Sequence, residues 1–413
     1  MTEVADKWGA VQGRARQLVV QHAGKRIQRL RLIHGMGQVE FAERLGIASG
    51  SVSKIENGRM TPTNELVEQI ASLFDCSATY VAGPERVGPT TRPWLRAYAD
   101  ASKKVVDQRA ADCTMASEVI EIIGLQQIPD TIPIFHGDLT DDDAIEQFAL
   151  DVRAAADLGD DEVVGHCIRA AERLGCLVLP MPDELGRHLG LSVRASQTPV
   201  ICVARTSGRH GIPGDRQRFT VAHEIGHLSL HAGHGPPETA ADATRFEKQA
   251  HRFAGAFLAP GDAILQDLHE HGGRVTLRTL ATLKEIWGIS IKALVMRFRG
   301  LGVIDDDHAR SVYKQISARG WNKSEPVEVG GEEAIWMRKA IIKFARNAPD
   351  SFQIAAEAAG IGTSYLRRWT DWDPQAEAEA EIFAIDQRPR RPPQRATARS
   401  DGSIVVLPRR HSP

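Results

Sequence analysis

The sequence predicts a mainly α protein with a small α+β part: an all-α N-terminal domain, then a mixed α+β domain and a helical C-terminal region. Three observations support this fold class. Between about 24 and 83, apolar residues recur at the spacing of several short helices. Two short runs rich in β-branched residues, CLVLPMP and PVICVAR, lie between helical segments near the middle of the chain. Helical spacing then continues to about residue 385.

Length and loop composition indicate where these parts meet. The 413 residues exceed one ordinary domain, and two turn-rich stretches, GPERVGPTTRP and IPDTIPIFHGDLTDDD, separate helical segments. The parts that we expect are an N-terminal extension at 1–23, the all-α domain at 24–83, a linker and helical connector at 84–140, the mixed domain at 141–301, a helical region at 302–385 and a basic disordered tail at 386–413.

Composition argues against a membrane protein or a secreted one. Hydrophobic residues make up 42% and charged residues 25% of the chain, and no apolar run approaches the roughly 18 residues of a membrane span. The N-terminus lacks a basic segment followed by an apolar one, so we expect a cytoplasmic protein with no membrane partner. The five cysteines are odd in number and include no C-x-x-C pair, which predicts reduced, mostly buried thiols.

The stretch QVEFAERLGIASGSVSKIENG, residues 38–58, has the outline of a helix-turn-helix. Phe41 and Leu45 share one face of a first helix, and Gly46 supplies a tight turn. Val52 and Ile55 then form the inward face of a second helix. Amphipathic helices on both sides can close a core around this pair, so we expect a complete small domain.

A helix-turn-helix docks its second helix in the major groove of DNA. That helix carries no Arg, and no Asn before Asn57, so we expect base readout to be modest or partly indirect. A bundle used only for protein contact or dimerisation is the alternative. The candidate DNA contacts are Gln38, Ser49, Gly50, Ser51, Ser53 and Lys54.

This domain resembles the Xre/Cro family of repressor domains. The residues that match recurrent positions of that family are Gln38, Val52, Ser53, Glu56 and Gly58. The resemblance implies that the chain binds a double-stranded DNA operator. Since such operators are symmetric, it also implies a homodimer.

The stretch VAHEIGHLSLH, residues 221–231, contains the pattern H-E-x-x-H. On a helix, His223 and His227 lie one turn apart on one face and can reach a single Zn²⁺ ion. Glu224 lies beside them and can accept a proton from water that the ion activates, which is peptidase chemistry. The extended metzincin pattern is absent, because Leu230 and Gly233 stand where that pattern needs Gly and His.

A catalytic zinc site requires a third protein ligand. Glu247 lies three residues before Ala250, on the inward face of a later helix, and a carboxylate that faces a core needs a charged partner. We therefore favour Glu247 as the third ligand. A zinc site that is structural, or that has been lost, is a further alternative. The other candidate ligands are His231, His234, Glu238, Asp242 and His251.

Over about 200 residues beyond the DNA reader, the sequence resembles the ImmA/IrrE family of zinc-dependent metallo-endopeptidases. The matching pieces are the strand-rich segment 176–205, RFTVAHEIGHLSLH, the later E-x-x-A-x-x-F-A stretch, KEIWGISIKALVMRFRGLGVI and QISARGW. The resemblance implies a gluzincin-like α+β metallopeptidase domain. It also implies Zn²⁺ held by His223, His227 and Glu247, with Glu224 as the general base. Ala259 departs from the family, which usually has Met there. Candidates for a donor to the transition-state oxyanion are Arg218, His231 and His251.

Taken together, the two resemblances imply a transcription regulator whose endopeptidase domain relieves repression by cleaving the chain itself, a sister subunit or a partner repressor. The 83–93 linker and the connector up to Thr140 are expected to be exposed and are candidate cut sites. The alternative is an Xre-type repressor or antitoxin whose metallopeptidase-like domain is catalytically silent and serves as a sensor or toxin-binding surface. A general housekeeping peptidase is disfavoured by the DNA reader.

One further pattern stands near the C-terminus. Residues 354–369, IAAEAAGIGTSYLRRW, have a helix, a Gly turn and a second helix. We favour a small packing hairpin there over a second DNA reader, since both give the same pattern.

Overall fold

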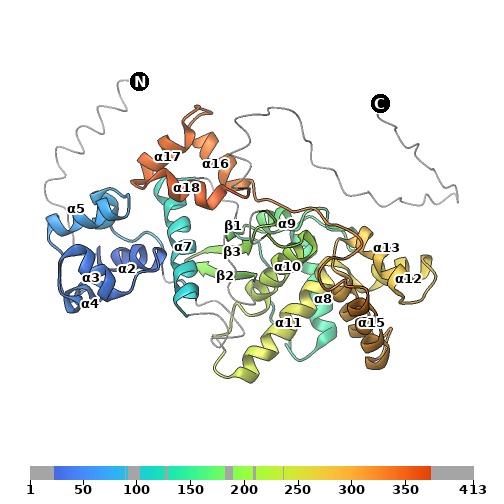
Figure 1. The fold of residues 1–413 in the computed structure, drawn as a ribbon. Coiled ribbons are helices and arrows are strands. Elements are labelled where there is room, and N and C mark those ends of the chain that lie inside the picture. The colour runs from blue at the N-terminus through green and yellow to red at the C-terminus, as the bar shows by residue number, and fades with distance from the viewer. Residues whose placement is uncertain are drawn as a thin grey trace.

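The computed structural model describes residues 23–88, 90–91, 103–125, 129–181, 189–207, 211–235 and 237–373. Figure 1 shows a helical N-terminal domain, a small central sheet and a larger set of helices on the far side of that sheet. This arrangement confirms the predicted fold class. The predicted N-terminal extension, apart from Ala23, and the predicted basic tail lie outside the described residues.

Five helices form the N-terminal domain, and they agree with the predicted apolar spacing. Gly46 ends the helix Gln38–Leu45 with a φ of 66°, a left-handed conformation that favours glycine. The hydroxyl of Thr63 caps the helix Asn64–Leu73 by accepting a hydrogen bond from the backbone N–H of Leu66. The helices are α2 (Ala23–Ile33), α3 (Gln38–Leu45), α4 (Ser49–Glu56), α5 (Asn64–Leu73) and α6 (Ala78–Ala82).

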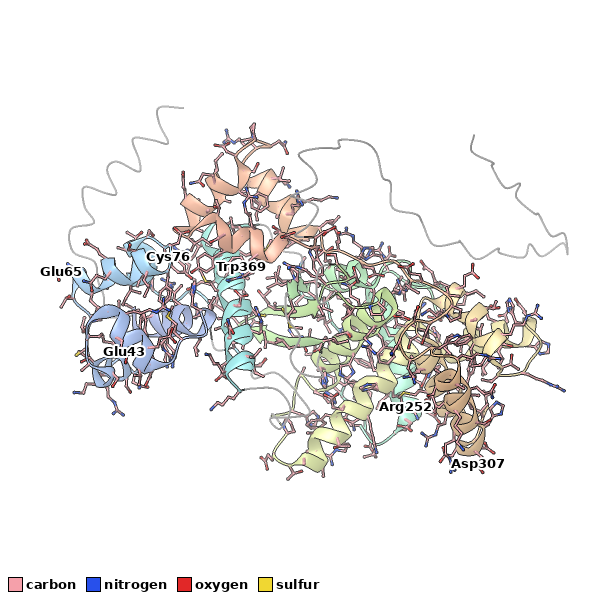
Figure 2. The ribbon with its side chains drawn as sticks, viewed as in Figure 1. Glu43, Glu65, Cys76, Arg252, Asp307 and Trp369 are labelled. Atoms are coloured by element: carbon pink, nitrogen blue, oxygen red, sulfur yellow. The ribbon has the colours of Figure 1, made fainter. Side chains whose placement is uncertain are left out.

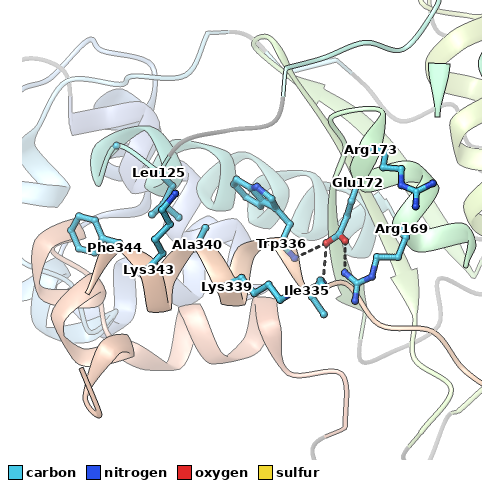
Figure 3. Close-up of a pocket in the computed structure, with 11 residues that line it drawn as sticks. Leu125, Arg169, Glu172, Arg173, Ile335, Trp336, Lys339, Ala340, Lys343 and Phe344 are labelled. Atoms are coloured by element: carbon cyan, nitrogen blue, oxygen red, sulfur yellow. Dashed lines mark hydrogen bonds and ion pairs between the residues drawn. The ribbon is translucent and has the colours of Figure 1, made fainter. Parts of the chain in front are cut away.

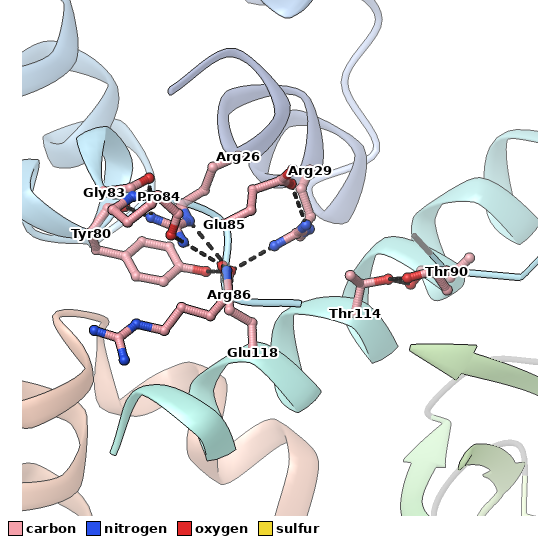
Figure 4. A network of polar contacts seen from close by, with 11 residues as sticks. Arg26, Arg29, Tyr80, Gly83, Pro84, Glu85, Arg86, Thr90, Thr114 and Glu118 are labelled. Carbon is pink, nitrogen blue, oxygen red and sulfur yellow. Dashed lines mark hydrogen bonds and ion pairs between the residues drawn. The ribbon is translucent and has the colours of Figure 1, made fainter. Parts of the chain in front are cut away.

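Helix α7 (Lys103–Ile122) joins this domain to the rest of the molecule. We expected the connector to be exposed, but the structure shows that most of α7 is buried between α2 and the central sheet. Because α7 packs against other parts of the protein on both sides, its sequence has only a weak amphipathic pattern. Buried charge is compensated: Glu118 accepts hydrogen bonds from Arg26 and Arg29, and also from the hydroxyl of Tyr80 (Figure 4).

The central sheet has three strands in the order β1-β3-β2. β1 (Leu177–Met181) runs parallel to β3 (Thr198–Ala204), and these are the two predicted strands. The third, β2 (Gly190–Ala195), pairs antiparallel with β3 through a two-residue turn in which Ser196 has a φ of 58°. In β2, Ser192 and Arg194 alternate with apolar residues, so the strand does not form a continuous apolar run.

Helices cover both faces of this sheet. On one face, Val178, Ile201 and Val203 pack into a core that they share with α8 to α11. On the other face, alternate strand residues pack with α7 and the N-terminal domain. The helices of the first core are α8 (Asp142–Ala155), α9 (Cys167–Arg173), α10 (Gly214–Leu230), α11 (Ala240–Leu258), α12 (Gly261–Glu270), α13 (Leu277–Trp287), α14 (Ile291–Gly300) and α15 (Asp306–Ala318).

The last three helices among the described residues are α16 (Trp336–Phe344), α17 (Ser351–Ala359) and α18 (Thr363–Thr370). The turn between α17 and α18 pairs with the N-terminal domain, where Cys76 and Ile361 form an antiparallel bridge. Indole Nε1 of Trp369 donates to Asp112 of α7 at 2.9 Å, at the same junction (Figure 2). The 354–369 segment is therefore engaged as a packing hairpin.

The described part of the chain holds no helix that is long and apolar enough to cross a membrane. The five cysteines, all of them described, are free thiols, and four of them are buried. This agrees with the prediction of reduced, mostly buried cysteines.

Candidate metal centre and DNA-binding surface

The two histidines of H-E-x-x-H lie on α10, and Glu247 lies on α11, which packs directly against it. Nε2 of His223 is 3.1 Å from Nε2 of His227. The Glu247 carboxylate places one oxygen 3.4 Å from His223 Nε2 and the other 3.5 Å from His227 Nε2. The structure thus brings the three predicted ligands together, and no fourth His, Cys, Asp or Glu joins the group among the described residues.

The spacing of the two ring nitrogens, and of each nitrogen from its nearer carboxylate oxygen, suits a tetrahedral zinc ion. Ligand atoms about 2.05 Å from a tetrahedral centre lie about 3.3 Å from one another. The observed separations of 3.1, 3.4 and 3.5 Å bracket that value. Two imidazoles and one carboxylate with an open fourth position are also the donor set that catalytic zinc sites use.

The electrostatics of the site also suit a cation. Burial is the largest influence on the pKa of His227 and lowers it to about 4. The ring is therefore neutral near pH 7 and can act as a ligand. Burial alone would raise the pKa of Glu247, but hydrogen bonds from His223 and His227 outweigh it and lower that pKa. The site therefore offers an ionised carboxylate and at least one neutral imidazole.

Glu224 is buried next to the predicted ligands and faces β2. One of its carboxylate oxygens accepts a 2.6 Å hydrogen bond from the hydroxyl of Ser192. Burial raises the pKa of Glu224 to about 7, although His223 and Ser192 act in the opposite direction. A group with a pKa near 7 is well matched to exchange protons at neutral pH.

Behind the predicted ligands lies a chain of polar contacts. Nδ1 of His227 is 3.0 Å from Nδ1 of His231, and Nε2 of His231 is 3.1 Å from the amide oxygen of Gln249. The Gln249 amide nitrogen donates in turn to the backbone carbonyl of Leu139 at 2.7 Å. His231 thus has the orienting position that the sequence left open, whereas Gln249 and Ser192 were not predicted.

The other candidate ligands have different surroundings. His251 stacks edge-on against the ring of His223 and contacts the backbone carbonyl of Glu247 through Nδ1 at 2.7 Å. Asp242 pairs with Arg245 and Thr239 at the start of α11. His234 and Glu238 are exposed. The guanidinium of Arg218, a candidate oxyanion donor, is engaged by Glu332 and by the carbonyl of Val164.

The predicted DNA-reading helix α4 presents an exposed face. Ser49, Gly50 and Lys54 are exposed, whereas Ser51 and Ser53 are partly buried. Gln38 does not point freely outward, because its amide donates at 2.7 Å to the buried carboxylate of Glu56. Glu56 also holds Arg31, so this network fixes α4 against α2 and α3.

The described part of the linker is held on the protein. Arg86 donates its backbone N–H to Glu118, and Val87 is buried. Thr90 pairs with Ala195 in an antiparallel bridge on the outer edge of β2, and its hydroxyl contacts Thr114 of α7 at 3.0 Å (Figure 4). The described linker is thus mostly exposed, as expected, with Pro84, Glu85, Arg86, Gly88 and Thr91 at the surface, but its backbone is held on the protein.

Comparison with known proteins agrees with both halves of this picture. Residues 27–81 match the helix-turn-helix family model, and residues 171–299 match the peptidase M78 model, described as the IrrE N-terminal-like domain. The chain is 33% identical over 63 residues to the uncharacterized HTH-type transcriptional regulator YazB of Bacillus subtilis, which covers 15% of this chain and 91% of that protein. The chain belongs to the helix-turn-helix family of transcriptional regulators.

A second relative of this regulator is antitoxin PezA of Streptococcus pneumoniae, 36% identical over 64 residues. That match covers 16% of this chain and 40% of PezA, so the chain spans less than half the length of that relative. Both relatives match a stretch no longer than one small domain. The regulator is thus a helix-turn-helix protein fused to an IrrE-like domain of a metallopeptidase family.

Proposed function

We propose that this regulator binds an operator through α4 and that its IrrE-like domain is a zinc-dependent endopeptidase that cleaves a repressor. The observation that carries the proposal is the grouping of His223, His227 and Glu247: the two ring nitrogens are 3.1 Å apart, and each lies within 3.5 Å of a Glu247 carboxylate oxygen. The buried Glu224 lies beside this group. A purely structural metal site has no need of such a carboxylate.

In this proposal His223, His227 and Glu247 hold the zinc ion. When bound, zinc supplies Lewis-acid chemistry that activates water and polarises a peptide carbonyl. Glu224 accepts a proton at its carboxylate and later returns it to the leaving nitrogen, for which a pKa of about 7 is suited. Ser192 holds that carboxylate in place, and His231 holds the ring of His227.

The edge of β2 supports a polypeptide as substrate. This strand lies at the end of the sheet order, so its outer backbone groups can pair with an added strand. Thr90 and Thr91 already occupy the end of this edge at Arg194 and Ala195. The remaining edge runs toward Ser192, which contacts Glu224, and so leads an extended chain to the proposed base.

Among the three possible substrates, a partner repressor or a sister subunit is favoured over cleavage of the chain's own linker. The described part of the linker is tied to Glu118 and to β2, and Val87 is buried. A protease needs an extended, accessible segment, so cleavage there would require local unfolding first.

The test follows intact mass over time for wild type and Glu224→Gln, each assayed for zinc, with operator DNA and with partner repressors supplied. We expect wild type to cleave a repressor, and Glu224→Gln to retain one zinc without cleaving. Loss of zinc binding in wild type, or equal cleavage by both proteins, would contradict the proposal.

A second candidate function is that of an antitoxin with a catalytically silent peptidase-like domain. It is favoured by the similarity of residues in the N-terminal domain to antitoxin PezA. In that case the protein should form a stable complex with a small toxin encoded beside it, and Glu224→Gln should change neither operator binding nor toxin binding. Cleavage of a repressor by wild type but not by Glu224→Gln would exclude this function.

A further inference from the structure

A cavity of about 600 Å³ lies away from the candidate metal centre, between α9 and α16. Gly124 and Leu125, which follow α7, complete its wall (Figure 3). Three separate parts of the chain therefore meet there: the connector, the IrrE-like domain and helix α16 of the C-terminal region. The volume lies within the range of roughly 300 to 1,000 Å³ that is typical of small-molecule sites.

The lining of this cavity is strongly cationic. Its lining includes Arg169, Arg173, Lys339 and Lys343 but only one carboxylate, that of Glu172. Glu172 is already engaged, because it pairs with Arg169 and accepts the backbone N–H groups of Ile335 and Trp336 at the start of α16 (Figure 3). The cavity thus offers positive charge in excess of what its own acid can neutralise.

Lys339 and Lys343 lie one turn apart on α16. Like charges at this spacing repel and destabilise a helix by a few tenths of a kcal/mol. Both lysines are exposed, and neither forms an ion pair within the described part of the chain. Both line the cavity, so an anion bound there would relieve the repulsion.

The cavity also offers flat apolar surface. Trp336 is partly exposed, Phe344 is 36% exposed, and both line the cavity with Leu125 and Ala340. Indole and phenyl rings stack well on another aromatic ring, and Lys and Arg form strong charge-assisted hydrogen bonds with phosphate. The combination selects a ligand that carries both an aromatic ring and an anionic group.

We propose that this cavity binds a nucleotide, with the base packed on Trp336 and the phosphates held by Lys339, Lys343 and Arg169. The site is independent of the proposed peptidase chemistry. Its position connects the cavity to both the N-terminal domain and the candidate metal centre. α16 leads into the hairpin that contacts the N-terminal domain, and α9 packs against α10, which carries the predicted zinc ligands.

The experiment is isothermal titration of the full chain with ATP, GTP, AMP and inorganic phosphate. We expect at least one nucleotide to bind more tightly than phosphate alone, and Lys339→Glu/Lys343→Glu to weaken that binding by at least about tenfold. Trp336→Ala should weaken nucleotide binding but not phosphate binding. The matched control is Lys314→Glu/Lys323→Glu, two exposed lysines outside the cavity, which should bind as wild type does.

Each other outcome counts against the proposal. The proposal is overturned if none of the three nucleotides binds. It is also overturned if Lys339→Glu/Lys343→Glu binds nucleotide as tightly as the control Lys314→Glu/Lys323→Glu. Thermal unfolding of each variant guards against misfolding, since both lysines of each pair are exposed and their replacement should leave the melting temperature almost unchanged.

Discussion

Nδ1 of His227 lies 3.0 Å from Nδ1 of His231, so the nitrogen of a predicted ligand that faces away from the metal site is held by a second histidine. His231 is fully buried and is fixed on its other side by Gln249. Such contacts behind a ligand set its tautomer and the direction of its ring. The ring of His223 has no comparable partner at Nδ1 among the described residues.

The first prediction follows from this asymmetry. His231→Ala should weaken zinc binding by about 10- to 100-fold, because the ring of His227 would lose the contact that orients it. A competition titration against a chelator measures the affinity. His269→Ala, an exposed histidine on α12, serves as the control and should bind zinc as wild type does. Equal zinc affinity in the His231 variant would show that the contact does not orient the ligand.

The second prediction concerns the hydrogen bond from Ser192 to Glu224. Ser192→Ala should lower kcat by about tenfold, since a bond to a charged group contributes roughly 1.5 kcal/mol or more. KM and zinc content should stay as in wild type, because the hydrogen bond of Ser192 is to Glu224 and not to one of the three predicted ligands. Steady-state cleavage of an identified repressor gives both constants. A change in KM alone would assign Ser192 to substrate binding instead.

Local sequence spacing predicted the elements of the site that lie on single helices. His223 and His227 are one turn apart, and Glu247 follows from the apolar spacing of α11. Ser192 and Gln249 could not be found in this way. Ser192 reaches Glu224 only because β2 pairs with β3 beside α10, and Gln249 acts through His231, 18 residues away.

The same distinction explains the error about the connector. Most residues of α7 are buried, but the groups that bury it come from α2, the sheet and the C-terminal hairpin. A helix that is enclosed on several sides has no clear apolar stripe, and its polar residues are satisfied by distant partners such as Arg368 for Asp112. Periodicity therefore predicted the helix but not its burial.

The third prediction concerns DNA. Lys54→Glu should weaken binding to all duplexes by a similar factor and reduce the salt dependence by about one counterion, as expected for a phosphate contact on the exposed face of α4. Fluorescence anisotropy at several salt concentrations measures both. Lys292→Glu, an exposed lysine on α14, is the control. An unchanged salt slope would remove Lys54 from the interface.

The fourth prediction concerns Glu332, which fixes the chain after α15 onto the IrrE-like domain. Its carboxylate pairs with Arg218 and accepts the backbone N–H of Ile168 at 2.9 Å. Burial alone would raise the pKa of Glu332, but Arg218 and then His166 outweigh it and lower the pKa to about 2. Glu332→Gln leaves Arg218 buried without its counter-charge and should cost about 3 kcal/mol of stability at pH 7.

The pH dependence of this cost has a definite sign. Because the pKa is lower in the folded protein than its ordinary value of 4.5, the ionised carboxylate stabilises the fold above about pH 4.5. That stabilisation is lost as the pH falls toward 2, so the difference between wild type and Glu332→Gln should shrink over this range. Urea unfolding at pH 7, 5 and 3 measures it, with the exposed Glu333→Gln as the control. A difference that stays constant with pH would mean that packing of the side chain, and not its charge, anchors this segment.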